Sequence, residues 1–535
     1  MPRYRSPVFP FIRPLELDGR AERRWPVAIV GAGPVGLVAA IDLALHGIAS
    51  VVLDESNVVS TGSRAICWSK RTLEIFDRLG IGDRVVTKGV TWKVGRLFHR
   101  GREVYAFDLL PEPGHKRPAF VNLQQYYVEE YLIDRARDFP DLIDLRFMSR
   151  VTSAGQDRDH AWVDVETPEG TYRLAADYLV AGDGVRSTVR RALGLDFVGR
   201  AFEERFLITD VEMAADFPSE RWFWFEPPFH DGQSALLHKQ PDNIYRIDLQ
   251  LGPDADPEIE RQPDRVIPRI RAMVGDRAFE IDWVSVYTFQ CRRLERFVHG
   301  RVIFAGDSAH IVSPFGARGG NGGIQDVDNL CWKLAAVLKG EAPSGLIESY
   351  NAERVHGADE NVLNSARATS FMTPKSRMER LFRDEVLALA GTHPFARQLV
   401  NSGRLSRPCS LAGFPLGTAD AVDIGGAMTP GAPCLDAPIR DAEGRDGWLL
   451  DHLGGAFVAL GFGDLPPTPR GVRRVIVSAD GDIDDLQGLV ATRYGGAPGV
   501  VYLIRPDQHV AARFKDPSAA AIADALGRAN AYGAA

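Results

Sequence analysis

Residues 27–54 read V-A-I-V-G-A-G-P-V-G-L-V-A-A-I-D-L-A-L-H-G-I-A-S-V-V-L-D, and this stretch decides the fold. Four apolar residues predict a short strand, which is followed by Gly31, Gly33 and Gly36 at G-x-G-x-x-G spacing. An apolar helix is expected from about residue 34 to 46, and a second strand at 50–53 ends at Asp54. This order of strand, glycine turn, helix, strand and acid predicts a dinucleotide-binding βαβ unit.

Each part of this unit has a physical role. Gly31 allows the tight turn, Gly33 has no side chain to block a pyrophosphate, and Gly36 lets the helix pack closely on the strand. The helix N-terminus offers unpaired N–H groups to phosphates. Asp54 is expected to bind a ribose hydroxyl. The stretch does not decide which dinucleotide binds.

The overall composition is that of a soluble globular protein. The 535 residues are enough for roughly two to four domains. They are 45% hydrophobic and 25% charged, and the net charge of −8 argues against a nucleic-acid partner. No apolar run approaches the roughly 20 residues of a membrane span, and the N-terminus does not resemble a signal peptide. The five scattered cysteines argue against disulfides or zinc and favour a cytoplasmic location.

Two further strands end in glycine and aspartate. Residues 177–181 lead into Gly182-Asp183-Gly184, and residues 301–305 lead into Gly306-Asp307. Carboxylates at such strand ends reach ligands bound to parallel sheets. Five glycines between 316 and 323 then precede a helix expected from about 324 to 339, and their unobstructed N–H groups predict an anion cradle.

Between these motifs the pattern changes to antiparallel strands. Residues 206–251 alternate as strands, and Pro241-Asp242-Asn243 is expected to make a hairpin turn. Residues 92–109 predict a further strand pair. We interpret these segments as a substrate domain inserted into the dinucleotide fold. After a Pro/Gly-rich linker at 413–438, residues 439–535 predict a compact α/β unit with a closing helix at 519–529.

Three separated motifs together resemble one family of flavoenzymes. They are G-A-G-P-V-G at 31–36, D-G-V-R-S at 183–187, and G-D-S-A-H at 306–310 followed by P-F-G-A-R-G-G-N-G-G. They resemble the class A, single-component FAD-dependent aromatic hydroxylases, the group of p-hydroxybenzoate hydroxylase and phenol hydroxylase. Nearly the whole chain is similar, most of all to enzymes of the 3-(3-hydroxyphenyl)propionate hydroxylase type. Residues 449–463 and 502–513 resemble the thioredoxin-like tail of the phenol hydroxylase branch.

The resemblance implies an α/β fold in three parts. These are a Rossmann-like FAD-binding domain, an inserted antiparallel-sheet substrate domain and a C-terminal thioredoxin-like domain. The tail lacks redox cysteines, so a structural role is expected for it. The expected division is an arm at 1–25, an FAD-binding domain at 26–90, 120–198 and 286–365, a substrate domain at 91–119 and 199–285, a helical segment and linker at 366–430, and the tail at 431–535.

The resemblance also implies which residues hold FAD. Asp183 matches a motif linked to both FAD and NAD(P)H, Asp307 matches the position that binds the ribityl chain, and Pro314 would lie near the flavin ring. Arg318 stands in a segment where the family commonly has Thr-Gly-Gly-Gln-Gly; it would place a cation near the flavin or be solvated. The implied cofactor-binding set is Gly31, Gly33, Gly36, Asp54, Arg64, Gln125, Asp183, Gly306, Asp307, Gly319, Gly320, Asn321 and Gly322.

The implied reaction is hydroxylation of a phenolic ring. NAD(P)H would reduce FAD, and O₂ would form a flavin C4a-hydroperoxide that transfers oxygen. His238 is the leading candidate to activate the phenol, with Gln240 orienting it, unless His238 is simply a satisfied sheet histidine. Gln240 stands where p-hydroxybenzoate enzymes place an Arg that binds the substrate carboxylate. Arg246 is the alternative residue for that role. Pro314 completes the catalytic set.

Two other functions remain open at this point. Trp222-x-Trp224 resembles a flavin-dependent halogenase motif, although Glu226 replaces its Ile. A non-catalytic FAD-binding redox sensor is the other alternative. The expected partners are a small phenolic substrate, O₂ and NAD(P)H, with no metal, nucleic acid or membrane. A homodimer is carried over from the family alone.

Overall fold

The glycine motif lies at the centre of an eight-stranded sheet. The computed structural model describes residues 4–19, 24–62, 64–230, 232–401 and 407–532. The strand order is β17-β18-β11-β1-β2-β8, and β9 and β10 extend the sheet from β11. Strands β18, β11, β1, β2 and β8 are mutually parallel. Their bounds are β1 (Trp25–Val30), β2 (Ser50–Leu53), β8 (Ile143–Arg146), β9 (Arg150–Gln156), β10 (Ala161–Thr167), β11 (Gly170–Ala181), β17 (Val298–His299) and β18 (Val302–Phe304).

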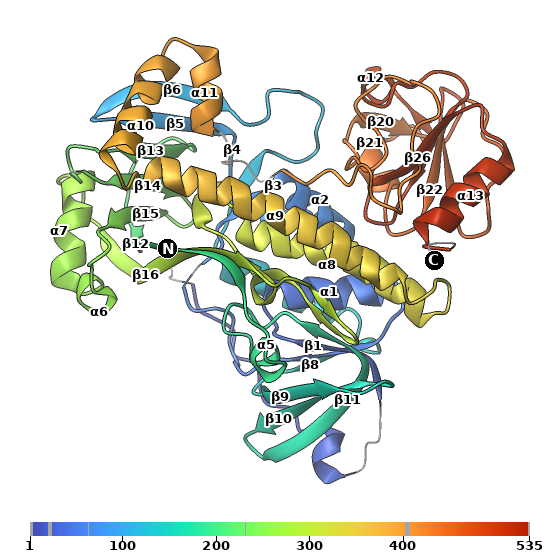
Figure 1. The fold of residues 1–535 in the computed structure, drawn as a ribbon, viewed down its shortest axis with the longest axis horizontal. Helices are drawn as coiled ribbons and strands as arrows, with labels where there is room; N and C mark the ends of the chain where they lie inside the picture. Colours follow the sequence, from blue (N-terminus) through green and yellow to red (C-terminus); the bar gives the residue numbers. More distant parts are fainter. Residues whose placement is uncertain (1–3, 20–23, 63, 231, 402–406, 533–535) are drawn as a thin grey trace.

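Helix α1 (Pro34–Leu45) packs between this sheet and the long helix α8 (Gly319–Leu338), as Figure 1 shows. All residues from Gly36 to Ala44 are buried, which explains why this helix is apolar on every side except at Asp42. Further helices surround the sheet and a small sheet of β3 (Cys67–Ser69), β7 (Phe120–Asn122) and β4 (Val90–Trp92). They are α2 (Lys70–Leu79), α3 (Gly82–Lys88), α4 (Gln125–Ala136) and α5 (Thr188–Ala192).

A second eight-stranded sheet forms the upper-left lobe of Figure 1. The strand order is β19-β16-β12-β15-β14-β13-β5-β6, and every pairing except β13–β5 is antiparallel. Asp242 and Asn243 have φ of 63° and 58°, which closes the predicted hairpin between β14 and β15. The bounds are β5 (Val94–His99), β6 (Arg102–Asp108), β12 (Val198–Glu212), β13 (Arg221–Phe225), β14 (Ser234–Lys239), β15 (Ile244–Leu251), β16 (Glu280–Arg293) and β19 (His310–Ile311).

The two faces of this sheet are covered by different helices. Trp224, Tyr245 and Ile247 belong to a core with α7 (Pro263–Val274), which follows α6 (Pro257–Glu260). On the opposite face, Phe223 and Leu236 pack with residues of α9 (Leu346–Met372), α10 (Arg377–Ala390) and α11 (Pro394–Asn401). No helix among the described residues is both long and apolar enough to cross a lipid bilayer.

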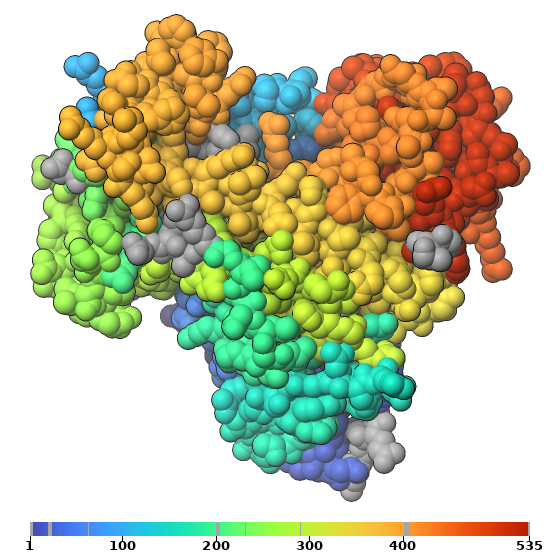
Figure 2. All heavy atoms as spheres, in the orientation of Figure 1, coloured from blue at the N-terminus to red at the C-terminus, as the bar shows by residue number. Residues whose placement is uncertain are grey.

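The C-terminal residues form a separate lobe, coloured orange to red in Figure 2. Its seven-stranded sheet has the order β21-β20-β24-β23-β22-β25-β26. The predicted closing helix is α13 (Ala519–Ala529). The strands and the other helix are β20 (Pro438–Asp441), β21 (Asp446–Trp448), β22 (Val458–Phe462), β23 (Arg473–Val477), β24 (Ile483–Asp484), α12 (Leu489–Tyr494), β25 (Val500–Ile504) and β26 (Val510–Lys515).

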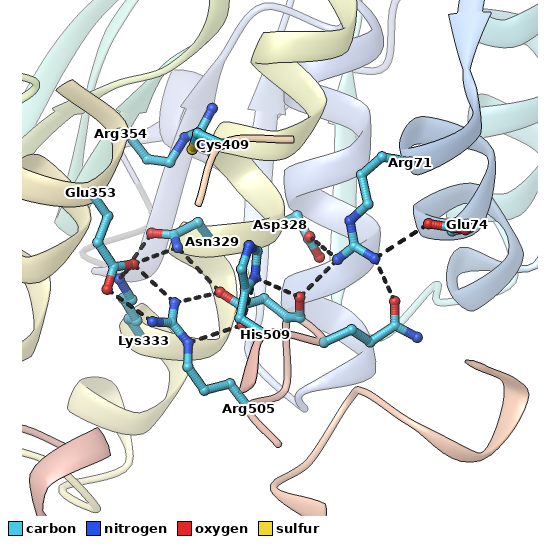
Figure 3. A network of polar contacts seen from close by, with 12 residues as sticks. Arg71, Glu74, Asp328, Asn329, Lys333, Glu353, Arg354, Cys409, Arg505 and His509 are labelled. Atoms are coloured by element: carbon cyan, nitrogen blue, oxygen red, sulfur yellow. Dashed lines mark hydrogen bonds and ion pairs between the residues drawn. The ribbon is translucent and has the colours of Figure 1, made fainter. Parts of the chain in front are cut away.

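The turn between β25 and β26 docks this lobe on α8 and α9 through buried polar groups (Figure 3). Arg505 donates to both carboxylate oxygens of Glu353 at 2.8 and 2.9 Å, and Lys333 donates to the same carboxylate at 2.8 Å. Asn329 bridges Glu353 and Asp507. The C-terminal lobe is therefore joined to α9 by the Arg505–Glu353 ion pair, and to α8, the helix that begins at the glycine-rich segment, by the Asn329–Asp507 hydrogen bond.

Candidate functional site

The three motif glycines have distinct surroundings. A Cβ on Gly31, where φ is 102°, would meet the Gly182 oxygen at 2.6 Å, and a Cβ on Gly36 would meet the Gly31 oxygen at 1.9 Å. A Cβ on Gly33 would meet no atom within 4 Å. Gly31 and Gly36 are thus required by the fold itself, whereas Gly33 borders open space at the N-terminus of α1.

Asp54 and Gln125 stabilise the loops around this space. The Asp54 carboxylate accepts hydrogen bonds from the Ala32 and Ser56 N–H groups at 2.6 and 2.8 Å. Burial raises the pKa of Asp54, and these two bonds oppose the shift. Gln125 accepts from the Ala65 N–H at 3.1 Å and donates to Glu129 at 2.8 Å. Both predicted cofactor residues thus also shape the protein backbone.

Asp183 and Asp307 end neighbouring parallel strands, β11 and β18. One oxygen of Asp183 accepts from the Val189 N–H at 3.1 Å, and the other is buried without a hydrogen-bond partner. Asp307 is exposed, yet the surrounding protein desolvates its carboxylate and raises its pKa. The charge of Arg64, which is also exposed, acts on Asp307. Solvent thus reaches this carboxylate although protein atoms surround it.

The glycine-rich segment forms the first turn of α8, so the expected helix start near residue 324 is wrong. The helix begins at Gly319, and no side chain caps it. A Cβ on Gly323 would lie 2.7 Å from Val35 and 2.9 Å from the Gly306 Cα, so glycine is needed for close packing and not for a loop. The uncapped N–H groups of the first turn form the positive end of a 20-residue helix.

Hydrogen bonds to other parts of the protein fix the side chains of two polar residues at this turn. The Asn321 side chain accepts from the Ser69 N–H at 2.9 Å and donates to the Cys67 oxygen at 2.8 Å. Arg318 is buried and donates to Asn361 of α9 at 2.8 Å, so the solvated alternative for Arg318 is wrong. Burial lowers the pKa of Arg318 to about 10.

These features suit FAD. Open space at Gly33, a buried unpaired oxygen on Asp183, an exposed Asp307 and an uncapped helix N-terminus offer sites for pyrophosphate, hydroxyl groups and the electron-rich edge of a flavin. They lie on the β1–α1 turn, the ends of β11 and β18, and the start of α8. The sequence motifs therefore converge on one cleft.

A row of polar residues crosses the second sheet on the face toward this cleft. Strand register places Asp210, Arg246, His238 and Arg221 side by side on β12, β15, β14 and β13. The His238 Nδ1 lies 3.8 Å from the Cys67 sulfur, and the Arg246 Nη1 lies 3.5 Å from the Arg64 carbonyl oxygen. The row thus faces the cofactor loops.

The predicted catalytic residues in this row differ in availability. Arg246 donates to both oxygens of Asp210 at 2.8 and 2.7 Å, and Gln240 donates to Asp210 at 3.2 Å. His238 is buried, and burial together with the charges of Arg221 and Arg246 places its pKa well below the usual value. His238 is therefore neutral, and the Arg246 charge is already compensated.

An apolar cavity lies beside this row. It encloses about 390 Å³, including space open to solvent. Phe315, which follows Pro314 at the glycine-rich segment, forms one wall and packs edge-on against Phe206 at 5.1 Å. Pro314 itself is exposed, unlike its buried neighbours. The lining residues are Trp92, Arg96, Leu97, Phe107, Leu109, Arg221, Phe223, Phe315 and Met372.

Sequence reasoning missed two polar groups on this face, Arg221 and Asp248. Arg221 lines the cavity, and Asp248 stands one row further along, opposite Leu236. Burial raises the pKa of Asp248 to about 6, against the effect of Arg246. For Arg221, the sequence pattern that could have revealed it is the alternation of residues along β13. Trp222 and Trp224 occupy one face of this strand, and Arg221 and Phe223 occupy the other.

Comparisons with known proteins agree with this site. The family described as "FAD binding domain" matches residues 24–365. A flavin-dependent monooxygenase of Mycobacteroides abscessus is 36% identical over 355 residues, 62% of this chain and 71% of the relative. A 3-(3-hydroxy-phenyl)propionate/3-hydroxycinnamic acid hydroxylase of Burkholderia vietnamiensis is 28% identical over 533 residues, 93% of this chain and 95% of the relative. The crystal structure of the flavin-dependent monooxygenase PieE with FAD and substrate has a TM-score of 0.77 at 24% identity, covers 96% of this chain and 100% of its own, and supports the fold.

Proposed function

Because this chain belongs to the FAD binding domain family and is a flavin-dependent monooxygenase, we propose that it hydroxylates a small phenolic substrate with NAD(P)H and O₂. Membership of this enzyme family removes the non-catalytic alternative. The observation that carries the proposal is the aromatic-walled cavity, which shares the Pro314–Phe315 segment with the cofactor cleft.

The cofactor residues proposed from the sequence keep their roles, with differences in how they act. When bound, FAD supplies electron transfer from NAD(P)H and the activation of O₂. Gly33 leaves room for the pyrophosphate, Asp183 offers its unpaired oxygen, and Asp307 offers an exposed carboxylate. The first turn of α8 presents N–H groups that stabilise negative charge on the flavin. Asn321 positions this turn through its bonds to β3.

The cavity suits an aromatic substrate, because most of its lining side chains are apolar. Trp92, Phe107, Phe223 and Phe315 provide apolar walls that hold the ring and exclude water. Pro314, which is exposed, is proposed to lie near the flavin ring.

A base near the substrate hydroxyl assists hydroxylation, because phenolate is more electron-rich than phenol. His238 is neutral and can accept a hydrogen bond, but its lowered pKa makes it a weak base. Asp248, with a pKa of about 6, is ionised at neutral pH and is the stronger proton acceptor on the same face. We therefore assign proton removal to Asp248 and hydrogen bonding to His238. Gln240 and Arg246 hold Asp210 and thereby position the row.

The tail and the domain division are part of the same proposal. In the C-terminal lobe, β22 and β23 are parallel, β25 is antiparallel to β22, and β26 and α13 follow. This order supports a thioredoxin-like domain with a structural role. The two eight-stranded sheets support the proposed FAD-binding and substrate domains.

The placement of Trp222 and Trp224 does not support a halogenase. Trp222 packs edge-on against Phe98 at 5.4 Å and Phe217 at 5.5 Å, on the face of the second sheet opposite the cavity. Trp224 stacks on Phe98 at 5.2 Å on the same face. These tryptophans are core residues.

The test is substrate-dependent oxygen use by the FAD-loaded protein. NADH or NADPH oxidation, O₂ uptake and peroxide release are measured with and without phenylpropionates, hydroxybenzoates, resorcinols and larger phenols. We expect one class to stimulate NAD(P)H and O₂ consumption in equal amounts, with little peroxide. If no phenol stimulates consumption although FAD is bound, the proposed reaction is wrong.

A further inference from the structure

The cavity contains two arginines, and they differ in whether their charge is compensated. Arg96 donates to both oxygens of Glu220 at 2.8 and 2.9 Å and to Glu103 at 2.8 Å. The side chain of Arg221 has no hydrogen bond or ion pair with any other residue that the structure describes, and only its backbone is paired, within the sheet. Its neighbours across the strands are His238, which is neutral, and Gly95, which has no side chain.

The other charges near Arg221 do not neutralise it. Arg246 forms its ion pair with Asp210. The charge of Asp248 acts on Arg221 and offsets only part of the effect of burial, and no hydrogen bond or ion pair joins the two side chains among the described residues. The Cys67 thiol is protonated, because burial raises its pKa to about 11. Burial lowers the pKa of Arg221 itself, which reflects a desolvated cation with little compensation.

An uncompensated guanidinium in an apolar cavity is costly unless a ligand supplies the opposite charge. A carboxylate can accept two N–H bonds from such a group in a bidentate arrangement. Around it, the cavity offers aromatic and aliphatic walls for the rest of the ligand. The site therefore has the chemistry of an aryl-acid pocket.

We propose that Arg221 binds a carboxylate on the substrate, so that the enzyme selects phenolic acids over neutral phenols of the same shape. This inference rests on the proposed function and names the substrate class of that site. It assigns to Arg221 the role for which Arg246 was the alternative in the sequence, and Arg221 lies in the same row on the other side of His238.

Binding of unreactive probes tests the proposal without turnover. The FAD-loaded protein is titrated with 3-phenylpropionate and with its neutral counterpart 3-phenylpropanamide, and with benzoate and benzamide, while the flavin absorption spectrum and the heat of binding are recorded. We expect the wild type to bind at least one acid about tenfold or more tightly than the matching amide. In R221Q this preference should disappear, and R221K should keep part of it.

The control is R102Q, which removes an exposed charge from β6 of the same lobe and should keep the full preference. Equal binding of acids and amides by the wild type would overturn the proposal, as would an undiminished preference in R221Q. FAD content reports whether each variant has folded, and R221K provides a second test if R221Q has not. The two proposals can fail separately. If R221Q loses the acid preference but no phenol stimulates NAD(P)H use by the wild type, the proposed reaction is refuted and the assignment of Arg221 stands.

Discussion

Gly33 and Gly36 show how two residues of one motif serve different purposes. Gly36 is enclosed, and its Cβ would meet the Gly31 oxygen at 1.9 Å, whereas Gly33 faces open space. A methyl group at Gly33 therefore fits the protein but occupies room that the pyrophosphate needs. At Gly36 the same methyl group forces the backbone apart.

We predict that Gly33→Ala weakens FAD binding about tenfold or more without lowering the melting temperature of the apoprotein. Gly36→Ala should lower that melting temperature by several degrees, since overpacking costs about 1–3 kcal/mol or more. Flavin fluorescence titration measures the affinity, and calorimetry of apoprotein measures stability. Equal effects of the two substitutions on both quantities would contradict the separate roles.

A second residue-scale prediction concerns Asp248 as the base. Its carboxylate faces Arg246, Asp210, Arg221 and Cys67, and its pKa is raised to about 6 by burial. The carboxylate accepts a proton only when ionised, so turnover should fall as pH drops below about 6. Asp248→Asn should reduce kcat by about 10²–10⁴-fold and remove this acid limb.

His238→Asn provides the comparison for Asp248→Asn. It should weaken substrate binding or slow turnover modestly, with the acid limb retained. An acid limb that survives in Asp248→Asn and vanishes in His238→Asn would reverse the two assignments. The pH dependence of kcat and of kcat/KM with a phenolic acid separates these outcomes.

Single residues were predicted from the sequence only where a motif fixes them. Gly31, Gly33 and Gly36 follow from spacing, because backbone geometry leaves few alternatives. Arg221 was missed, since its importance depends on which charged neighbours pair with one another across four strands. Arg246 was a reasonable candidate to bind a substrate carboxylate. The strand register places Asp210 opposite Arg246, so its charge is already paired. Pairing of charges is a tertiary property that no local pattern records.

At the scale of elements, the turn between β25 and β26 is the key to the C-terminal lobe. Arg505 is buried and shares Glu353 with Lys333. Burial alone would raise the pKa of Glu353, but Arg505 and Lys333 lower it to about 2. Burial lowers the pKa of Lys333 to about 8 in spite of Glu353. Arg505 is therefore the main counter-ion of this carboxylate.

We predict that Arg505→Ala destabilises the protein by about 3–5 kcal/mol, because Glu353 loses its main counter-ion while buried. The double variant Arg505→Met with Glu353→Met should not recover this loss, since Lys333 then loses Glu353 and Asp507 loses Arg505 while both stay buried. Chemical denaturation measures both. Arg445→Ala is the control, because Arg445 forms only exposed ion pairs on the same lobe. A loss under 1 kcal/mol in Arg505→Ala would show that the network does not hold the lobe.

Elements were predicted more completely than residues. The helix at 519–529 was placed correctly, and the hairpin turn at 241–243 joins β14 to β15 as expected. The start of α8 was placed too late because five glycines suggest a loop. Close contact with Val35 and Gly306 compensates for their poor helix propensity. Packing overrode propensity there.

At the scale of the whole molecule, buried acids with lowered pKa values predict how stability responds to acid. His310 and Arg354 lower the pKa of Asp326 to about 2 although burial alone would raise it, and Glu353 has a similar value. Both pKa values lie below those of the unfolded chain. The stabilisation is therefore complete above about pH 4.5 and is lost as pH falls toward 2.

We predict that the melting temperature falls steeply in this range and that Glu353 alone contributes about 3 kcal/mol to the change. Calorimetry between pH 7 and pH 2.5 measures the effect. Glu353→Gln should be less stable at neutral pH and should show a shallower decline in acid. Parallel curves for the wild type and Glu353→Gln would exclude Glu353 as a source of the acid sensitivity.

The junction between α8 and the C-terminal lobe also has a consequence for biosynthesis. On the ribosome, α8 and α9 are complete long before Arg505 is added, so Lys333 and Glu353 emerge without their third partner. Until β25 and β26 arrive, the helix that begins at the flavin cleft lacks its final anchor. A message cut short near its end would yield a chain with every nucleotide-binding motif intact and a poorly supported cofactor helix. Strands β25 and β26 thus complete the support of a helix that is translated well before them.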